Sequence, residues 1–215
     1  FKPTDLTPLP QQIENNNIED NVIEDNVIED NVTRNDEVKR WSIRQAEDLD
    51  AAALREFAQR TFYDTFAASC DRDDMAAYMQ DAFSLERVRS EIAAPSNIFL
   101  LLKLTETDAE TGALRGYAKL QAGEAETGVS GVNPIELGRL YIDKSAIGQG
   151  YGSMLMQAAL DWAADLHCDT LWLGVWEYNH RAIAFYKRWG FEQVGDHAFM
   201  LGQDRQTDWI MQRAV

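Results

Sequence analysis

The sequence predicts an α/β architecture in which a mixed β-sheet carries helices on both faces. The chain has 215 residues, 45% of them hydrophobic, which is enough for one globular domain with a sizeable core. Strand-type and helix-type patterns alternate through the C-terminal half, and such alternation is typical of a sheet covered on both sides. The longest apolar run, at residues 98–102, has the length of a strand, so we expect no membrane span.

The first half of the predicted domain combines helices with a hairpin. The expected elements are a strand at 41–44, helices at 46–69, 73–83 and 85–94, and strands at 97–104 and 116–122. The first helix has apolar residues at helical spacing, and acids precede the second, where the positive end of a helix favours them. Pro95 ends the third helix. The polar stretch between the last two strands indicates a hairpin connection.

The second half shows the clearest alternation of the two periods. The expected elements are strands at 135–142, 170–176, 191–194 and 208–211, and helices at 150–167 and 180–189. Gly190 follows the second helix and suits a left-handed helix stop. Each strand in this part is preceded or followed by a helix, which favours the two-sided sheet.

Residues 1–38 differ from the rest and predict a disordered acidic extension. The sequence Ile-Glu-Asp-Asn-Val occurs three times in succession between Ile18 and Val32. A period of five matches neither the helix nor the strand period, so the repeats form no stable apolar face. The repeats are also dense in acids and contain no aromatic residue. The folded domain is therefore predicted to span residues 39–215.

The formal net charge of −16 bears on the choice of partner. Residues 1–38 hold ten acids against two bases, and the rest holds 26 acids against 18 bases, so both parts are acidic. An acidic body repels nucleic-acid phosphates and attracts cations, polycationic small molecules included. We therefore expect no nucleic acid as a partner. Acidity that only keeps the protein soluble would give the same charge, so charge alone does not select a polycation.

The cysteines and histidines predict neither a disulfide nor a metal site. Cys70 and Cys168 lie far apart and form no C-x-x-C pair, which is typical of reduced thiols in a cytoplasmic protein. The three histidines, at 167, 180 and 197, show no ligand spacing, so no metal is expected. The sequence leaves open the oligomeric state, a homodimer included.

The most informative segment runs from Ile147 to Ser153, between a predicted strand and a predicted helix. Its glycines, Gly148, Gly150 and Gly152, let the backbone approach a ligand and turn N–H groups toward it. The helix N-terminus adds positive potential, so the segment predicts an anion cradle suited to a pyrophosphate. It lacks the Lys of a Walker loop, and Ser153 stands where a Rossmann fingerprint needs glycine. A glycine-rich turn that only allows tight packing would look the same.

Two motifs together resemble those of the GNAT superfamily of acetyltransferases. The first is Q/R-x-x-G-x-G/A after a strand, which Gly150 and Gly152 match, although Ile147 stands in the Gln or Arg place. The second is a strand followed by N-x-x-A-x-x-x-Y and Gly-Phe, matched from Asn179 to Tyr186 and then at residues 190–191. Over about residues 40–215, the chain also resembles the PaiA-type spermidine/spermine acetyltransferases. The segments that carry this resemblance are residues 61–66, 75–78, 82–83, 173–177 and 206–208.

The resemblance implies the GNAT fold and an acetyl-CoA-dependent N-acetyltransferase. The implied fold is α/β (α+β), with a mixed, mostly antiparallel central sheet of about six to seven strands. Acetyl-CoA or CoA would be the co-substrate, and a small, polycationic primary amine such as spermidine or spermine the acceptor. The residues implied to bind the cofactor are Leu140, Tyr141, Ile142, Ile147, Gly148, Gln149, Gly150, Tyr151, Gly152, Ser153, Asn179 and Tyr186.

Amide formation from a thioester also needs an oxyanion donor, an acid and a base. By the resemblance, backbone N–H groups around Tyr141 would polarise the thioester carbonyl. Tyr186 would protonate the leaving thiolate, although the same residue also fits an apolar helical stripe of the core. Asn179 would hold the pantetheine arm of CoA, and it equally suits an N-cap.

Glu136 is the candidate base. Many relatives carry a Glu directly before the position of Arg139, where this chain has Gly138, so Glu136 is the nearest acid. In a regular strand, residues 136, 138, 140 and 142 share one face. Glu136 would then reach the amine through water, and Glu177, at the end of the next strand, is the reserve.

Candidate acceptor residues surround the link between the first two helices. Tyr63 and Tyr78 could offer cation–π surfaces to a polyamine, with Asp64 and Glu177 supplying negative charge. Asp71 and Asp73 read equally well as helix N-terminal acids. Two other functions stay open: an acetyltransferase for a protein or peptide amine, and a CoA-binding regulatory module without turnover.

Overall fold

The computed structural model describes residues 40–68, 70–105, 113–201 and 204–215. The predicted acidic extension at 1–38 lies outside the described residues. The elements are β1 (Arg40–Gln45), η1 (Asp48–Asp50), α1 (Ala51–Phe66), α2 (Arg72–Ala82), α3 (Leu85–Ala93), β2 (Asn97–Thr105), β3 (Ala113–Ala122), β4 (Pro134–Ile142), η2 (Lys144–Ala146), α4 (Tyr151–Asp165), β5 (Thr170–Trp176), α5 (His180–Arg188), β6 (Glu192–Leu201) and β7 (Asp204–Ala214).

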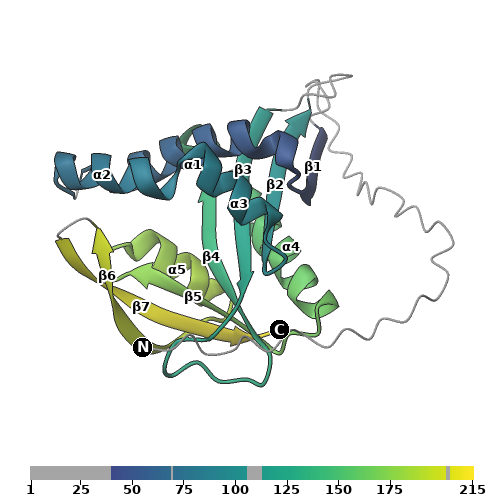
Figure 1. Cartoon of the computed structure of the whole chain (residues 1–215). Coiled ribbons are helices and arrows are strands. Elements are labelled where there is room, and N and C mark those ends of the chain that lie inside the picture. The colour runs from purple at the N-terminus through teal and green to yellow at the C-terminus, as the bar shows by residue number, and fades with distance from the viewer. Residues whose placement is uncertain (1–39, 69, 106–112, 202–203) are drawn as a thin grey trace, which may run out of the picture. The chain divides into compact units, whose positions relative to one another are not determined.

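The strands form one seven-stranded sheet in the order β1-β2-β3-β4-β5-β7-β6 (Figure 1). Every neighbouring pair is antiparallel except β4 and β5, which run parallel. The predicted mixed, mostly antiparallel sheet of six to seven strands is therefore confirmed.

The parallel pair β4–β5 is joined at one end only. Its register covers Pro134 with Thr170, Ile135 with Leu171, and Glu136 with Trp172. Beyond Glu136 the two strands diverge, so the sheet opens into a β1–β4 wing and a β5–β7 wing (Figure 1). The central part of β4 thus has β3 on one side and no paired strand on the other, which leaves backbone groups free for a ligand.

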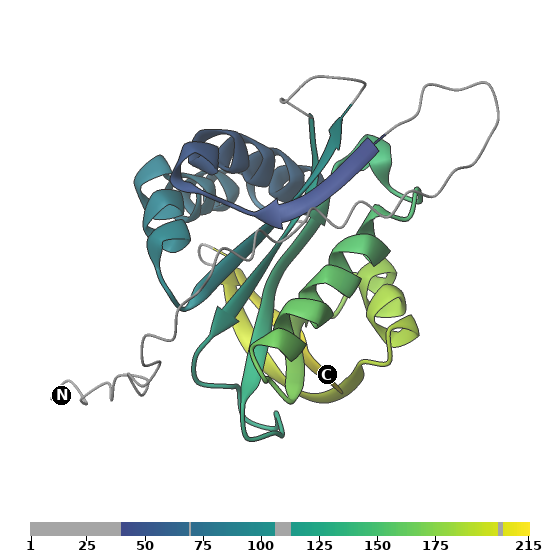
Figure 2. The same ribbon diagram turned by 90° about the vertical axis from the view of Figure 1, so that its right-hand side faces the viewer.

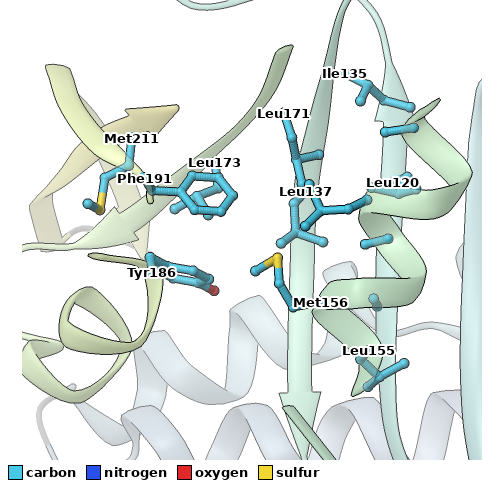
Figure 3. Packing of buried hydrophobic residues seen from close by; sticks show 14 of the residues in the cluster. Leu120, Ile135, Leu137, Leu155, Met156, Leu171, Leu173, Tyr186, Phe191 and Met211 are labelled. Carbon is cyan, nitrogen blue, oxygen red and sulfur yellow. The ribbon is translucent and has the colours of Figure 1, made fainter. Parts of the chain in front are cut away.

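Helices cover both faces of the sheet, as Figure 2 shows: α1, α2 and α3 lie on one side, and α4 and α5 on the other. The α4–α5 core includes Leu155, Met156 and Ile183, packed on Leu137 and Leu173 of the central strands (Figure 3). The α1–α3 core, also continuous, is rich in aromatic side chains. Its buried aromatic members are Phe57, Phe62, Phe83, Phe99 and Tyr117.

The hydrophobic run at β2 shows why a buried strand lacks alternation. Leu100 and Leu102 face the α4–α5 core, whereas Phe99 and Leu101 face the α1–α3 core. Both faces are covered, so every position favours an apolar residue. None of the described helices is long and apolar enough to cross a lipid bilayer.

Three predicted elements had boundaries that were wrong by four residues or more. The first helix begins at Ala51 and not at 46, because Ala46 N–H still bonds to the Phe99 carbonyl (2.8 Å) and a 3₁₀ turn follows. The two closing strands are each much longer than predicted and form a hairpin. A register shift between Gln193 and Gly195 interrupts the alternation that would have indicated a long strand.

Candidate active site

A β-bulge in β4 decides which side chains face the acceptor side of the sheet. Lys119 pairs with Arg139 but Leu120 pairs with Leu137, so Gly138 is an extra residue in β4. Before the bulge, Ile135 and Leu137 face the α4–α5 core, and after it Leu140 and Ile142 do so. The expectation that residues 136, 138, 140 and 142 share one face is therefore wrong, because the bulge reverses the alternation.

Glu136 consequently lies on the same face as Arg139 and Tyr141. Its carboxyl extends over Gly138: a Cβ at Gly138 would stand 3.5 Å from Glu136 Oε1. Because Gly138 has no side chain, the Glu136 carboxyl can lie over the bulge, next to the point where β4 and β5 diverge. Burial raises the pKa of Glu136; the charges of Lys119 and His197 oppose that rise.

A second group of titratable side chains comes from β6, β7 and the β3–β4 loop. His197 Nδ1 lies 3.1 Å from Glu126 Oε1. His197 and Asp208 are directly opposite each other on β6 and β7. One oxygen of Asp208, Oδ1, is buried and has no hydrogen-bond partner among the described residues. Burial raises the pKa of Asp208, and the charge of His197 opposes this.

Gly174 of β5 lets these groups lie close over the strand. It is exposed although both its neighbours in the strand are buried. A Cβ there would stand 3.4 Å from His197 Nε2 and 3.6 Å from Asp208 Oδ2. We name Glu126, Glu136, His197 and Asp208 the acceptor-face cluster. Sequence reasoning found only Glu136, because the other three come from a loop and two strands whose pairing brings them together.

The basic residues beside Glu136 are engaged elsewhere. Arg139 donates two hydrogen bonds to Glu91 of α3, at 2.8 and 3.2 Å. Lys119 lies 3.3 Å from the same carboxylate. This network fixes α3 on β3 and β4, and it leaves the acceptor-face cluster with more acidic than basic groups. The face therefore suits a cationic ligand.

Tyr186 lies on the opposite face, in the α4–α5 core. Its side chain is 9% exposed, and its ring packs near Phe185 and Phe191. Figure 3 shows the hydroxyl directed away from α5 and toward Met156. Burial raises the pKa of Tyr186 to about 12, so the phenol keeps its proton at neutral pH. Tyr186 is therefore a core residue that carries a protonated hydroxyl.

The glycine-rich segment joins β4 to α4 as predicted. Gly148 and Gly150 have φ of 85° and 89°, the left-handed region that favours glycine, and a Cβ at either would meet nothing within 4 Å. The Gly150 carbonyl accepts hydrogen bonds from the N–H groups of Ser153 and Met154. The open backbone at a helix N-terminus fits an anion such as a pyrophosphate.

The remaining residues of the segment have different tasks. A Cβ at Gly152 would make ordinary contacts with Phe185 at 3.7 Å and Ile142 at 3.9 Å, so this position faces α5 and β4 but has space for a methyl group. The Gln149 side chain donates to the Ser145 carbonyl (3.0 Å), which ties the loop to η2. Ile147, in the place of the usual Gln or Arg, is extended and 40% exposed.

Asn179 caps α5. Its Oδ1 accepts a hydrogen bond from Ala182 N–H at 3.2 Å. The cap uses only the amide oxygen, so the Nδ2 donors are available for a ligand. The two alternatives for Asn179, cap and pantetheine contact, are thus compatible.

An aromatic rim borders the acceptor-face cluster; we use this name for Phe66, Tyr78, Trp176 and Phe199. Phe66 meets Trp176 at 6.1 Å between ring centroids, and Tyr78 meets Phe199 at 5.9 Å. Phe199 lies two residues from His197 on the same strand, and Trp176 two residues from Gly174, so each pair shares a face. The rim joins α1 and α2 to the β5–β7 wing.

The predicted acceptor residues fall into different places. Tyr78 belongs to the rim, but its ring is also stacked on Phe62 at 4.9 Å. Tyr63 and Asp64 are exposed on α1. Glu177, half-buried just after β5, bonds through its N–H to the Thr207 carbonyl. The structure thus brings Tyr78 and Glu136 to the acceptor face, whereas Tyr63 and Asp64 belong to neither the rim nor the cluster.

Asp71 caps α2, accepting hydrogen bonds from the N–H groups of Asp73 and Asp74. Its reading as a helix N-terminal acid is therefore confirmed. Within the described ranges, no group of three or more His, Cys, Asp or Glu side chains is placed to hold a metal ion.

Comparison with known proteins agrees with this geometry. The Acetyltransferase (GNAT) family model matches residues 51–191. An uncharacterized N-acetyltransferase of Lactobacillus delbrueckii subsp. lactis is 32% identical over 173 residues, which cover 80% of this chain and 96% of that protein. A spermine/spermidine N(1)-acetyltransferase of Bacillus subtilis is 34% identical over only 64 residues, 29% of this chain and 42% of that protein.

Among solved structures, the PaiA N-acetyltransferase of Thermoplasma acidophilum, in complex with coenzyme A, has the same fold. Its TM-score is 0.64 at 21% identity, with 81% of this chain and 99% of that chain covered. The match to the family model extends from the first residue of α1 to the Gly-Phe pair after α5. The chain therefore belongs to the GNAT family and is an acetyl-CoA-dependent N-acetyltransferase.

Proposed function

We propose that the protein transfers the acetyl group of acetyl-CoA to a primary amine of a polyamine such as spermidine or spermine. The observation that carries this proposal is the acceptor-face cluster, in which three carboxylates and one histidine come together from β4, β6, β7 and the β3–β4 loop. Aromatic side chains of the rim lie beside them, and such rings attract alkylammonium groups. The partial similarity to a spermine/spermidine acetyltransferase supports the same acceptor class.

Coenzyme A fits the residues on the α4–α5 side. The open backbone at Gly148, Gly150 and Tyr151 would hold the pyrophosphate at the positive end of α4. The backbone of β4 from Leu140 to Ile142, which no strand pairs on the β5 side, would hold the pantetheine arm and the thioester, together with Asn179. When bound there, acetyl-CoA supplies an activated acyl group.

The residues of the chain would then divide the proton transfers between the two faces. Glu136 takes one proton from the acceptor ammonium, directly or through water, so that the nitrogen lone pair can attack the thioester carbonyl carbon. Backbone N–H groups of β4 stabilise the oxyanion, by about 2.7–4 kcal/mol per donor in comparable sites. As the C–S bond breaks, Tyr186 donates its proton to sulfur, and the nitrogen loses its second proton to solvent water, from which Tyr186 is reprotonated.

Thiol release from acetyl-CoA across a panel of amines tests this proposal. The most informative pair is 1,4-diaminobutane and butylamine, which share a four-carbon chain and differ in the second ammonium. We expect kcat/KM for spermidine and the diamine to exceed that for butylamine by about tenfold or more. Turnover of lysine peptides alone would instead assign a protein acceptor, and coenzyme A binding without turnover of any amine a regulatory module. A homodimer remains a prediction, which light scattering would test.

A further inference from the structure

Asp208 is the least satisfied charged group on the acceptor face. Its Oδ1 is buried and, within the described residues, accepts no hydrogen bond. A carboxylate with one enclosed, unpartnered oxygen costs free energy, and a cation bound at its other oxygen would offset part of that cost. The cost is visible in the raised pKa of Asp208.

Gly174 and His197 are the neighbours of Asp208 on this face of the sheet. Gly174 in front of it is exposed within a strand whose flanking residues are buried. His197, its cross-strand neighbour, is turned toward Glu126, with which it shares a hydrogen bond of 3.1 Å. His197 is therefore an ion-pair partner of Glu126, and its charge also lowers the pKa of Asp208. The other oxygen of Asp208, Oδ2, is not enclosed as Oδ1 is, and it lies over Gly174, 3.6 Å from the point where a Cβ would stand.

Asp208 and Glu136 stand on different wings of the sheet. Glu136 is the last β4 residue paired with β5, and Asp208 lies on β7 opposite Trp176, the last residue of β5. Two carboxylates on opposite sides of the opening suit a ligand with two separate positive charges better than a ligand with one. Trp176 of the rim offers an aromatic surface beside Asp208.

We infer that Asp208 binds the ammonium group of the acceptor that does not react, and so makes the enzyme selective for diamines and polyamines over monoamines. This inference rests on the proposed acetyl transfer to an amine. In this arrangement Glu136 faces the reacting nitrogen, and Asp208 holds the second nitrogen through Oδ2, the oxygen that the protein does not enclose. Asp208 is thus a specificity-determining residue, not a proton acceptor.

The test compares the same two amines in the wild type and in Asp208→Asn. Asparagine keeps the size of the side chain and removes its charge. We expect kcat/KM for 1,4-diaminobutane to fall about 10- to 100-fold, the usual cost of losing a hydrogen bond to a charged group. For butylamine it should change by no more than about threefold. Asp208→Glu, which keeps the charge, should recover part of the preference for the diamine.

Asp196→Asn is the matched control, since Asp196 is an exposed acid on the same strand as His197. Asp196→Asn should leave kcat/KM for both 1,4-diaminobutane and butylamine unchanged. An equal loss for both amines in Asp208→Asn would place Asp208 at the reacting nitrogen and overturn the inference, as would an unchanged preference. A wild type that acetylates butylamine as well as the diamine would also overturn it. Failure of the wild type to acetylate any amine would instead refute the proposed function.

Discussion

At the scale of single residues, Tyr186 carries the acid role in the proposed reaction. Tyr186→Phe keeps the ring in the core and removes only the hydroxyl. We expect kcat to fall about 100-fold, the lower range for loss of a general acid, while the melting temperature stays nearly constant. Because burial raises the pKa of Tyr186 to about 12, ionisation of this phenol should cause no loss of rate between pH 7 and 10.

Stopped assays of thiol release across that pH range measure both the fall in kcat of Tyr186→Phe and the pH dependence of the wild-type rate. Tyr178→Phe is a suitable control, since Tyr178 is 63% exposed. A Tyr186→Phe variant with the wild-type rate would remove the acid role from this residue.

Glu136 should show a conflict between stability and activity. Burial raises the pKa of Glu136, so the folded protein holds this proton more tightly than the unfolded chain does. Stability is therefore lost as the pH rises from the ordinary carboxyl range through the raised pKa. Glu136→Gln removes that loss: at pH 7 we expect a melting temperature about 1–4 °C higher, together with a rate at least about 100-fold lower.

Differential scanning fluorimetry at pH 4 and pH 7 measures the first effect. The stabilisation by Glu136→Gln should shrink at pH 4, where the wild-type carboxyl is protonated as well. A variant that is less stable than the wild type at pH 7 would argue against a strained, buried carboxyl at this position.

At the scale of elements, the turn between β4 and α4 depends on backbone conformation. Gly150 has φ of 89°, so alanine there is strained by about 1–2 kcal/mol. We expect Gly150→Ala to raise the KM for acetyl-CoA about 5- to 30-fold. Gly152→Ala should have a smaller effect, because its Cβ would make only ordinary contacts with Phe185 and Ile142.

Gly123→Ala serves as the control for these kinetics, since Gly123 lies in the β3–β4 loop and its Cβ would meet nothing within 4 Å. If Gly150→Ala and Gly123→Ala had the same KM for acetyl-CoA, the turn would not bind the cofactor.

The elements also show what sequence patterns reveal and what they miss. The Tyr151–Asp165 and His180–Arg188 helices could be predicted almost to the residue, because apolar periodicity marks both, with a glycine before the first and a glycine after the second. The bulge at Gly138 could not, since it depends on the register of β4 against β3. For the same reason Glu136 could be proposed but its face could not be assigned.

The rest of the acceptor face shows the same limit. His197 and Asp208 lie on strands whose pairing is set by the hairpin, and Glu126 lies in a loop with no periodicity. No local pattern connects these three residues, so only the tertiary structure reveals that they are neighbours.

At the scale of the whole molecule, the negative charge should aid capture of a polycation. Residues 1–38 carry half of the formal net charge of −16. We expect deletion of these residues to leave kcat unchanged and to lower kcat/KM for spermidine a few-fold at low salt, because long-range attraction is weakened. The difference in kcat/KM should vanish near 0.5 M salt, where the Debye screening length is only about 4–5 Å. Steady-state kinetics at several salt concentrations would show this, and a large loss of kcat would mean that the segment takes part in the site.

The central claim is that the opening between β4 and β5, with the glycine-rich turn at the start of α4, binds coenzyme A. Titration of coenzyme A into the purified full-length protein in a calorimeter tests it most directly. The account predicts one site per chain with a dissociation constant between about 1 μM and 1 mM, and weaker binding to Gly150→Ala. An absence of binding heat at millimolar concentration, confirmed by unchanged thermal stability in the presence of the ligand, would contradict it.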